Sequence, residues 1–517
     1  MDGVRVYMRK LLKIFTSRVV LVGLAIIIQG LWLLIFFAYL GTYSIYINIF
    51  FRVLSILILL YLIRKDENSA YKIVWIILIM AVPLLGGVLY LMIGNKRPSR
   101  RLAKRLAKVK DGMQETMAQN EDILEKIRET DPQTAGGLAY IGKYGGYPVW
   151  KNTSVKYYRV GEEMFSDMLE DIRSAQHYIF LEYYIIAEGV MWDMILELLL
   201  RKVKEGVDVR LIYDDVGCVS LLPIHYAQKL EEMGIKCMAF NRFIPFFSIV
   251  MNNRDHRKIL VIDGHTAYNG GINLADEYIN RKMRFGHWKD TAVRLEGEAV
   301  FNFTMMFLEI WNGFRAPETD FEQFRPHRWH PEAFEDDGYV VPYSDTPLDN
   351  EALGENVYIN ILNQAKDYVY IATPYLLVSD EMESALCLAA KRGVDVRIQM
   401  PGIPDKKLVF SMARTYYPAL LNAGVKIYEY TPGFVHAKSF VCDDRIATVG
   451  TINLDYRSLY LHFECGTFLY RCSAVMDIKH DFEECFNKSH EVSLADCREG
   501  LIGGIVNSAL RVVAPLM

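Results

Sequence analysis

Long apolar runs fill the N-terminal fifth of the chain, and short alternating segments fill the rest. The runs Val19–Leu40, Ser44–Ile63 and Ile73–Ile93 are close to the roughly 20 residues that a helix needs to cross a bilayer, and only the second contains a charge, Arg52. A cleaved signal peptide has one shorter apolar core. We therefore predict a membrane anchor over residues 1–110 with two or three transmembrane helices. Arg52 is interpreted as a residue whose side chain reaches the membrane interface, because long basic side chains commonly do so. A functional role for this arginine is the less favoured interpretation.

Basic residues flank the apolar runs on both sides. Some lie within residues 1–18, and a denser cluster covers Lys96–Lys110. Because short segments rich in lysine and arginine stay in the cytoplasm, the denser cluster predicts a cytoplasmic body after it. Leu102, Leu106 and Val109 recur at helical spacing within that cluster. This pattern fits an interfacial helix on anionic lipid and equally a solvated juxtamembrane segment.

The longer part of the chain repeats one pattern of strand-like and helix-like segments. The first copy begins at Tyr178-Ile-Phe-Leu-Glu and passes through a helix-like stretch to Gly206-Val-Asp-Val-Arg; the second begins at Tyr368-Val-Tyr-Ile-Ala and reaches Gly393-Val-Asp-Val-Arg. Strands that alternate with helices predict α/β units around a largely buried sheet. Both glycines fall where the end of a helix needs a positive φ.

The repeat sets the expected domain organisation. A polar and acidic linker, helical or loose, covers 111–135, the first α/β domain covers 136–340 and the second covers 341–517. A chain of 517 residues is also too long for one ordinary core, which agrees with several domains.

Charge and cysteine content narrow the class of protein. The net charge of -4 disfavours a general nucleic-acid-binding protein, which usually has a basic balance. The eight cysteines are scattered and form no C-x-x-C pair. This spacing predicts reduced thiols in a cytosol-facing domain, with neither a disulfide framework nor a zinc site.

Both copies end in the same motif, H-x-K-x4-D, followed by a Gly-x-x-Asn turn. The motif residues are His256, Lys258, Asp263, His436, Lys438 and Asp443. One such motif is a weak signal, because single histidines are more often ordinary core or surface residues. Two copies at equivalent places in a repeat are a strong one. The apolar residues after each lysine predict a buried strand, on which residues i and i+2 share a face, so each histidine and its lysine point the same way.

Two further pairs complete the candidate site. Asn273 and Asn453, seventeen residues after each histidine, are expected on the neighbouring strand, where their amides can donate to a phosphate. Asp290 and Glu464 are the candidates to hold one ring nitrogen of each imidazole, which fixes the tautomer and leaves the other nitrogen free. The remaining nine histidines, including His462, are expected to be ordinary.

The motif aspartates lie an odd number of residues after their histidines. Asp263 and Asp443 belong to the candidate catalytic set by their motif, but seven residues from the histidine places them on the opposite strand face. Both stand where the strand ends in turn residues, so we expect a mainly structural role.

Two histidines and two lysines in one pocket suit double displacement at phosphorus. One neutral imidazole attacks and forms a phosphohistidine, while the other, protonated, gives its proton to the leaving oxygen. Lysines and asparagines stabilise the charge on the equatorial oxygens. This chemistry needs no metal and no cofactor.

Several longer segments carry a family resemblance. They are Val82-Pro-Leu-Leu-Gly-Gly-Val-Leu-Tyr, HRKILVIDG from His256, GGINLADEY from Gly270, WKDT from Trp288, VGTINLDYRS from Val449, and the ending Arg511-Val-Val-Ala-Pro-Leu. With them, nearly the whole chain resembles the bacterial cardiolipin synthases of the phospholipase D superfamily. The family commonly has two N-terminal spans, so Val19–Leu40 is an apparent extra, and His462 stands where asparagine is expected.

The resemblance implies a fold and a reaction. The fold is an anchor of transmembrane helices followed by two phospholipase D-type α/β domains with a shared active site between them. In the reaction, one phosphatidylglycerol donates its phosphatidyl group and releases glycerol, and a second accepts it to give cardiolipin. His256 is then the nucleophile and His436 the general acid and later base, with the reverse assignment open. The implied setting is the bacterial cell membrane, multi-pass, with anionic lipid as partner and the catalytic domains in the cytoplasm.

Three alternatives remain for comparison. Another phosphatidyltransferase or a hydrolytic phospholipase D on the same scaffold differs only in its lipid products. A membrane-tethered nuclease is disfavoured by the net charge of -4. A catalytically silent scaffold has no need for two complete histidine–lysine pairs. The oligomeric state does not follow from the sequence.

Overall fold

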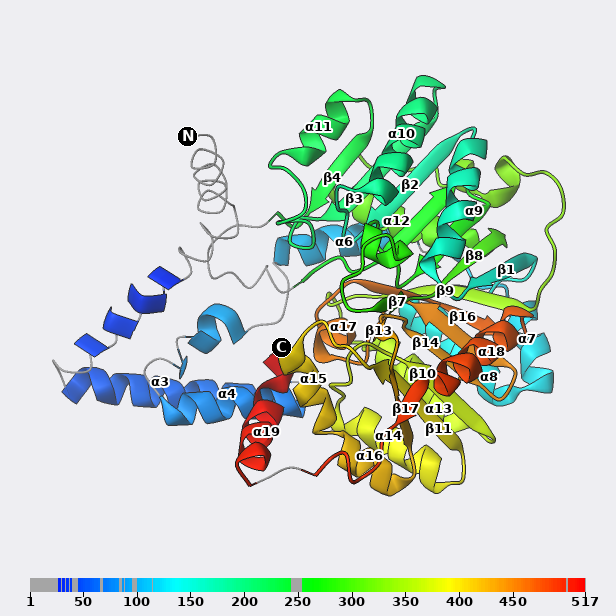
Figure 1. Cartoon of the computed structure of the whole chain (residues 1–517). Coiled ribbons are helices and arrows are strands. Elements are labelled where there is room, and N and C mark those ends of the chain that lie inside the picture. Colours follow the sequence, from blue (N-terminus) through cyan, green and yellow to red (C-terminus); the bar gives the residue numbers. More distant parts are fainter. Residues whose placement is uncertain are drawn as a thin grey trace, which may run out of the picture.

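The computed structural model describes residues 27–28, 30–32, 34–36, 38–39, 45–65, 68–82, 86–87, 89–94, 100–113, 115–242, 253–498 and 501–516. Its body contains two mixed β-sheets, one from each repeat, drawn one above the other in Figure 1. In both, three parallel strands continue into antiparallel ones. The two predicted α/β repeats are confirmed.

The strands of the first sheet, in spatial order, are β1 (Thr153–Tyr158), β8 (Ala292–Gly297), β6 (Thr266–Gly270), β5 (Lys258–Ile262), β2 (Tyr178–Tyr183), β3 (Asp208–Asp214) and β4 (Lys236–Phe240). Those of the second are β17 (Ser489–Glu491), β12 (Lys426–Tyr430), β11 (Asp395–Pro401), β10 (Tyr368–Ala372), β14 (Ser439–Cys442), β15 (Ile446–Gly450), β16 (Glu464–Tyr470) and β9 (Tyr339–Asp345). Gly206 and Gly393 have φ of 91° and 97°, as their place after a helix predicted.

Helices cover the sheets. In the first half they are α9 (Gly161–Ser174), α10 (Val190–Lys204), α11 (Tyr226–Glu232) and α12 (Val300–Phe314). In the second they are α13 (Leu353–Gln364), α14 (Asp380–Lys391), α15 (Lys407–Arg414), α16 (Tyr417–Ala423), α17 (Tyr456–Tyr460), α18 (Ala474–Asn487) and α19 (Leu501–Val513). Short 3-10 and π turns span Tyr90–Gly94, Ile141–Gly145, Asp276–Ile279, Glu322–Phe324, Pro326–Arg328 and Ala514–Leu516.

Strand β5 shows why its sequence has no polar alternation. Ile259 and Val261 lie in the core shared with the second half, whereas Leu260 and Ile262 lie in the core beneath α9 and α10. Both faces of the strand are therefore covered, and a strand buried on both faces reads as a continuous apolar run. The same reasoning applies to α12, which is apolar on nearly all sides and buried between the halves.

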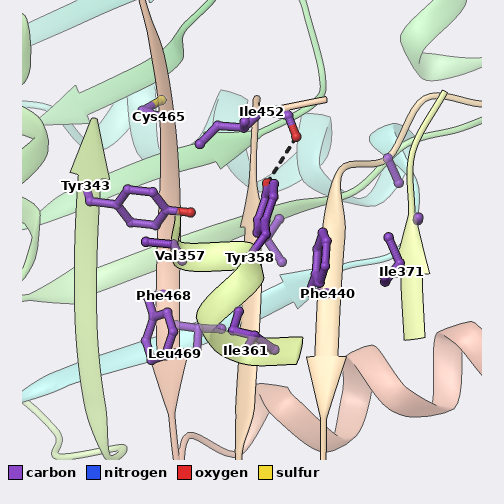
Figure 2. Close-up of a cluster of buried hydrophobic side chains, with 14 of the residues drawn as sticks. Tyr343, Val357, Tyr358, Ile361, Ile371, Phe440, Ile452, Cys465, Phe468 and Leu469 are labelled. Atoms are coloured by element: carbon purple, nitrogen blue, oxygen red, sulfur yellow. Dashed lines mark hydrogen bonds between the residues drawn. The ribbon is translucent and has the colours of Figure 1, made fainter. Parts of the chain in front are cut away.

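The second half packs α13 against its sheet, as Figure 2 shows. The ring of Tyr358 stacks on that of Phe440 with 4.1 Å between centroids, and its hydroxyl donates to the carbonyl of Ile452 at 3.0 Å. The hydroxyl of this aromatic residue thus has a partner within the core, as a buried phenol requires. The turn that leads to Asn453 is fixed by this contact.

The segment before β1 is helical and packed. It contains α6 (Arg100–Met113), α7 (Glu121–Thr130) and α8 (Pro132–Tyr140). On α6, Leu106 is fully buried against α12, while Lys104 and Lys108 are exposed. The apolar stripe predicted for this segment therefore contacts protein rather than lipid, and only its basic face is left for a membrane surface.

Helices α7 and α8 occupy most of the predicted linker and pack on the second half. Thr134 donates to Gln364 at 3.0 Å, and Asp131 pairs with Arg445. Strand β9 crosses the predicted domain boundary at 340 and belongs to the second sheet. The limits 136–340 and 341–517 stay predictions.

The N-terminal helices α3 (Ile45–Arg64) and α4 (Ser69–Ala81) pack together beside α19, at the edge of the second half in Figure 1. The predicted run Ile73–Ile93 is interrupted, because α4 ends at Ala81 and the following Val82 precedes a proline, which disfavours helical φ and ψ. Val19–Leu40 lies mostly outside the described residues. Within the part of the chain that the structure describes, no helix has the length and apolarity needed to cross a membrane.

Candidate active site

A short parallel pair of strands joins the two halves and positions the second motif. Strand β7 (His287–Lys289) pairs with β13 (Gly433–Val435), one strand from each half. The residue after β7 is Asp290 and the residue after β13 is His436. The backbone N–H of His436 donates to the carbonyl of Lys289 at 2.7 Å, so the pairing sets the histidine beside the aspartate.

The first motif meets the second half in the same manner. The N–H of His256 donates to the carbonyl of Phe463 at 2.9 Å, and the N–H of Phe463 donates to Arg254 at 2.8 Å. Glu464 follows directly and begins β16. Each histidine is therefore held by backbone bonds to the residue that precedes a carboxylate of the other half.

The side chain of each motif histidine also pairs with a carboxylate of the other half. His256 Nδ1 lies 2.9 Å from the carboxylate of Glu464, and His436 Nδ1 lies 2.6 Å from Oδ2 of Asp290. Because an ionised carboxylate only accepts, each Nδ1 carries a proton and each neutral imidazole has its lone pair on Nε2. Neither half contains a complete histidine–carboxylate pair by itself.

The motif lysines contact their histidines and are buried. Lys258 Nζ donates to the carbonyl of His256 at 2.5 Å, and Lys438 Nζ lies 2.8 Å from His436 Nδ1. Lys258 is also close enough to His436 and Lys438 to lower the pKa of both. The two motifs thus form one electrostatic site.

Burial sets the protonation states. It lowers the pKa of His256 to about 3, with Lys258 acting in the same direction against Glu464. It lowers the pKa of His436 to about 4, together with Lys438. Burial also lowers the pKa of Lys258 to about 8 and that of Lys438 to about 7, the second helped by Lys258. Near neutral pH both imidazoles are uncharged, which is the nucleophilic form.

The asparagines lie just beyond strands β6 and β15 rather than on them, a correction to the prediction. Asn273 donates to the hydroxyl of Tyr278 at 2.7 Å and accepts from the N–H of Ile185 at 3.0 Å. Asn453 donates to Ser458 at 3.0 Å. Each amide nitrogen has two hydrogens, so one donor remains on each residue for a ligand.

The motif aspartates bind backbone and do not contact the histidines. The Asp263 carboxylate accepts from the N–H groups of residues 176, 177 and 178 at 2.7–2.8 Å. Asp443 does the same for residues 366, 367 and 368 at 2.8–2.9 Å. Both have a positive φ, near 50°. This placement favours the structural interpretation and argues against their inclusion among the catalytic residues.

Sequence reasoning missed the residues that support the carboxylates. Thr451 donates its hydroxyl to Glu464. The equivalent residue in the first half is Gly271, where a Cβ atom would lie 2.0 Å from Asp290 Oδ1. One carboxylate is thus held by a hydroxyl and the other needs the space that glycine leaves. In the sequence, this difference is visible as Gly270-Gly271 in the first copy and Gly450-Thr451 in the second.

Aromatic residues beside the histidines were also missed. Tyr184 packs against His256 with 4.8 Å between ring centroids, and Tyr278 packs edge-on against His436 at 5.4 Å. Trp288 lies 5.5 Å from His436. These rings cover part of each imidazole and contribute to its burial. A tyrosine at the end of the first repeated strand was the available signal for Tyr184.

His462 lies in the site although it was expected to be ordinary. Its ring centroid is 5.6 Å from that of His256, and its Nδ1 is 3.7 Å from Glu464 Oε1. His256, His462 and Glu464 form the single group, among the described residues, whose side chains come close enough to share a metal ion.

The arrangement favours chemistry on an anionic phosphate. Two neutral imidazoles present Nε2, two buried ammonium groups supply positive charge, and two amides supply donors. The Nδ1 carboxylates stabilise an imidazolium when it forms. This set can bind a phosphodiester, displace one oxygen and protonate it.

Comparison with known proteins agrees with this chemistry. The family model "Cardiolipin synthase, PLD-like domain" matches residues 168–296 and 358–486. The model "Phospholipase D-nuclease N-terminal" matches residues 53–95. The two matched segments of the first model each contain one motif and one carboxylate of the site.

Relatives extend over nearly the whole chain. A protein of Streptococcus mutans, described as uncharacterized, is 49% identical over 459 residues, which cover 89% of this chain and 99% of that protein. Cardiolipin synthases of Alkalihalophilus pseudofirmus and Halalkalibacterium halodurans are 32% and 33% identical, cover 91% and 92% of this chain, and are themselves covered to 94%.

A solved structure supports the fold. Phosphatidylserine synthase of Haemophilus influenzae superposes with a TM-score of 0.52 at 13% identity, over 70% of this chain and 93% of that one. With the family model and the relatives, the histidine pair shared between two like halves leads to one assignment. The chain belongs to the bacterial cardiolipin synthases of the phospholipase D superfamily and is a phosphatidyltransferase of that type.

Proposed function

We propose that this enzyme makes cardiolipin from two phosphatidylglycerol molecules through a phosphohistidine intermediate. In the first step, Nε2 of His256 attacks phosphorus, the bond to the glycerol oxygen breaks, and His436 gives that oxygen a proton. In the second step, the hydroxyl of another phosphatidylglycerol loses its proton to His436 and attacks, and the bond from phosphorus to nitrogen breaks. Glycerol and cardiolipin are the products.

The crossed histidine–carboxylate pairs are the observation that carries this proposal. Both imidazoles are held through Nδ1, at 2.9 Å and 2.6 Å, so both leave Nε2 free for a substrate. The bound phosphodiester is an anion, and a nearby negative charge favours the protonated imidazole. Substrate binding therefore raises the pKa of the histidine that acts as acid, which is neutral in the free enzyme.

His256 as nucleophile rests on analogy within the superfamily, and the near symmetry of the repeat leaves the opposite assignment to experiment. Lys258, Lys438, Asn273 and Asn453 are proposed to hold the non-bridging oxygens. Asp290 and Glu464 are proposed as positioning residues. Transfer rather than hydrolysis requires that water is excluded and the acceptor is held close, which a pocket against lipid provides.

A membrane location is proposed from three features. The N-terminal runs are long and apolar, and α3 exposes apolar side chains on the side away from α4, including Phe50, Leu57 and Leu60. The basic face of α6 is left uncovered. The proposed setting is the bacterial cell membrane, multi-pass, with the catalytic domains in the cytoplasm.

Two loops beside His436 add support for anionic lipid as partner. Ile403 N donates to the carbonyl of Gly433 at 3.0 Å, and Gly286 forms a bridge with the same glycine. On the loop before Gly286, Met283 is 85% exposed next to exposed Lys282. The second loop exposes Ile403 in the same way, next to lysines 406 and 407. Apolar side chains beside basic ones suit a surface that docks on anionic headgroups.

The decisive test is analysis of lipid products. Purified full-length enzyme in phosphatidylglycerol vesicles, without added metal, is compared with His256→Ala, His436→Ala and the exposed control His490→Ala. We expect cardiolipin and glycerol in equal amounts from the parent and the control, and neither from the two site variants. The variant of the nucleophile alone fails to form a phosphorylated protein when the reaction is quenched.

Two outcomes contradict the proposal. Phosphatidic acid as the sole product makes the enzyme a hydrolase. Undiminished cardiolipin formation by either site variant removes the shared site. A membrane-tethered nuclease is tested in parallel by its salt-dependent affinity for DNA, which we expect to be absent.

A further inference from the structure

The two half-sites differ at one equivalent position. Two residues before Glu464 stands His462, and two residues before Asp290 stands Trp288. The two side chains occupy matching places, since His462 lies 5.6 Å from His256 and Trp288 lies 5.5 Å from His436, between ring centroids. The first histidine therefore has an imidazole beside it where the second has an indole.

His462 is largely but not fully buried, and its ring nitrogens make no hydrogen bond. Its side chain is only 10% exposed, and neither ring nitrogen has a hydrogen-bond partner. Glu464 Oε1 lies 3.7 Å from His462 Nδ1 and 2.9 Å from His256 Nδ1. A buried polar group without a partner costs stability, so a side chain with two such nitrogens indicates a ligand.

The donor atoms fit a transition-metal ion. Glu464 lies 2.9 Å from His256 Nδ1 and 3.7 Å from His462 Nδ1, and the three ligand atoms lie within 4.8 Å of one another. Tetrahedral zinc with bonds near 2.0–2.1 Å places its ligand atoms about 3.4 Å apart. Small side-chain rotations therefore suffice. Two imidazoles and a carboxylate with one open position are a donor set that zinc takes up readily.

We propose that His256, His462 and Glu464 form an inhibitory site for a divalent transition-metal ion such as Zn²⁺. The ion takes the place of the proton on His256 Nδ1, and Nε2 takes up a proton from solvent in exchange, so the imidazole stays neutral. A neutral imidazole coordinated through Nδ1 carries its proton on Nε2, so the lone pair that attacks phosphorus is lost. Binding holds His256 in the unreactive tautomer, and removal of the metal restores it.

The chemistry of the site also sets its selectivity. Mg²⁺ and Ca²⁺ prefer oxygen ligands and do not compete for two imidazoles. The Lys258 ammonium is close enough to oppose a cation, since it lowers the pKa of His256. The other half-site, with Trp288 in the equivalent place, lacks the third ligand. One ion is therefore expected per chain, bound more weakly than a structural zinc.

Binding is measured directly, so that this inference and the proposed function can fail separately. Full-length enzyme in detergent is dialysed against Zn²⁺ and titrated with Co²⁺, whose visible absorption reports nitrogen coordination. The parent, His462→Asn, His462→Gln and the exposed control His490→Asn are compared, with Mg²⁺ in a parallel series. The two His462 variants guard against a substitution that merely fails to fold.

We expect one Zn²⁺ per parent chain, with affinity weakened by roughly 100-fold or more in both His462 variants and unchanged in the control. Cardiolipin formation, which rests on the proposed function, falls over the same Zn²⁺ range in the parent and returns with a chelator. Measured relative to its own metal-free rate, the activity of each His462 variant resists Zn²⁺ over that range. Equal zinc affinity in parent and variants, or no Co²⁺ absorption by the parent, overturns the proposal.

Discussion

At the scale of single residues, a proton on Nδ1 decides that Nε2 is the nitrogen of a histidine that can react. Glu464 and Asp290 are fully buried and accept from Nδ1 of His256 and His436. Asp290 has a lowered pKa, because the cationic groups beside it outweigh the effect of burial. Both carboxylates stay ionised, so both imidazoles keep the tautomer with a free Nε2.

Replacement of either carboxylate by its amide tests this directly. In Glu464→Gln and Asp290→Asn the amide can donate to Nδ1, which turns the lone pair away from phosphorus. We expect kcat for cardiolipin formation to fall by about 10⁴-fold with little change in KM, as for other catalytic histidines that lose their carboxylate. Glu483→Gln, on the exposed face of α18, is the matched control. A loss smaller than threefold in folded enzyme excludes the positioning role.

The lysines predict the alkaline limb of the pH profile. An ammonium group carries its charge below its pKa, and burial lowers the pKa of Lys438 to about 7 and of Lys258 to about 8. As pH rises through this window the site loses the cations that bind phosphate. We expect kcat/KM, which reports the free enzyme, to decline between about pH 7 and pH 8.

The variant Lys438→Arg tests whether loss of the positive charge at this position causes the alkaline limb of the pH profile. A guanidinium stays protonated above pH 12, so we expect a lower maximum but an alkaline limb shifted upward. Steady-state rates from pH 6 to pH 10 on vesicles of fixed composition provide the measurement. An unchanged limb in the variant shows that another group titrates.

At the scale of elements, the motif aspartates join the end of one strand to the start of its neighbour. Asp263 closes the turn after β5 by accepting three N–H groups at the start of β2, and Asp443 does so for β14 and β10. The histidine–lysine pair lies at the other end of the same strand. Its position therefore depends on a contact far from the chemistry.

Asp263→Asn is expected to lower stability rather than turnover. The amide keeps the positive φ but replaces an accepting oxygen by a donor that faces N–H groups, which costs about 2 kcal/mol in the free energy of unfolding. Asp443→Asn is expected to cost less, because two of its three backbone partners are exposed. Denaturant unfolding and kcat per folded molecule are compared. Loss of kcat in fully folded Asp263→Asn contradicts the structural role.

At the scale of the whole molecule, a buried ion pair holds the halves together beside the site. Lys289 Nζ on β7 lies 2.6 Å from Asp481 on α18, and both side chains are less than a tenth exposed. Tyr157 of β1 donates to the same carboxylate at 2.6 Å. The carbonyl of Lys289 also accepts from His436, so the pair fixes the inter-half strand contact.

Breaking this pair leaves a charge buried. We expect Lys289→Met to lower the free energy of unfolding by about 3 kcal/mol or more, because Asp481 then has no cation. The double variant Lys289→Met with Asp481→Leu is expected to recover most of that loss, since a buried ion pair adds little over apolar packing. Denaturant titrations of both variants decide the matter. Equal losses in the single and double variants contradict an inter-half ion pair.

Much of the fold followed from local pattern. The repeat, the strands after each lysine and the glycines after helices depend on residues a few positions apart, and the structure agrees with them. Exceptions arose where an element met a distant one. The apolar stripe of α6, for example, packs against α12 rather than against lipid.

The candidate site divides in the same way. Sequence pattern alone determined the two motifs, their spacing on strands and hence a phosphate-directed chemistry, because side-chain direction along a strand has a period of two residues. Tertiary structure alone decided that Glu464 holds a histidine 208 residues away and Asp290 one 146 residues away. It also placed His462 beside His256. Such partnerships depend on how two sheets pack against each other, and that packing is set by many distant contacts that no local period records.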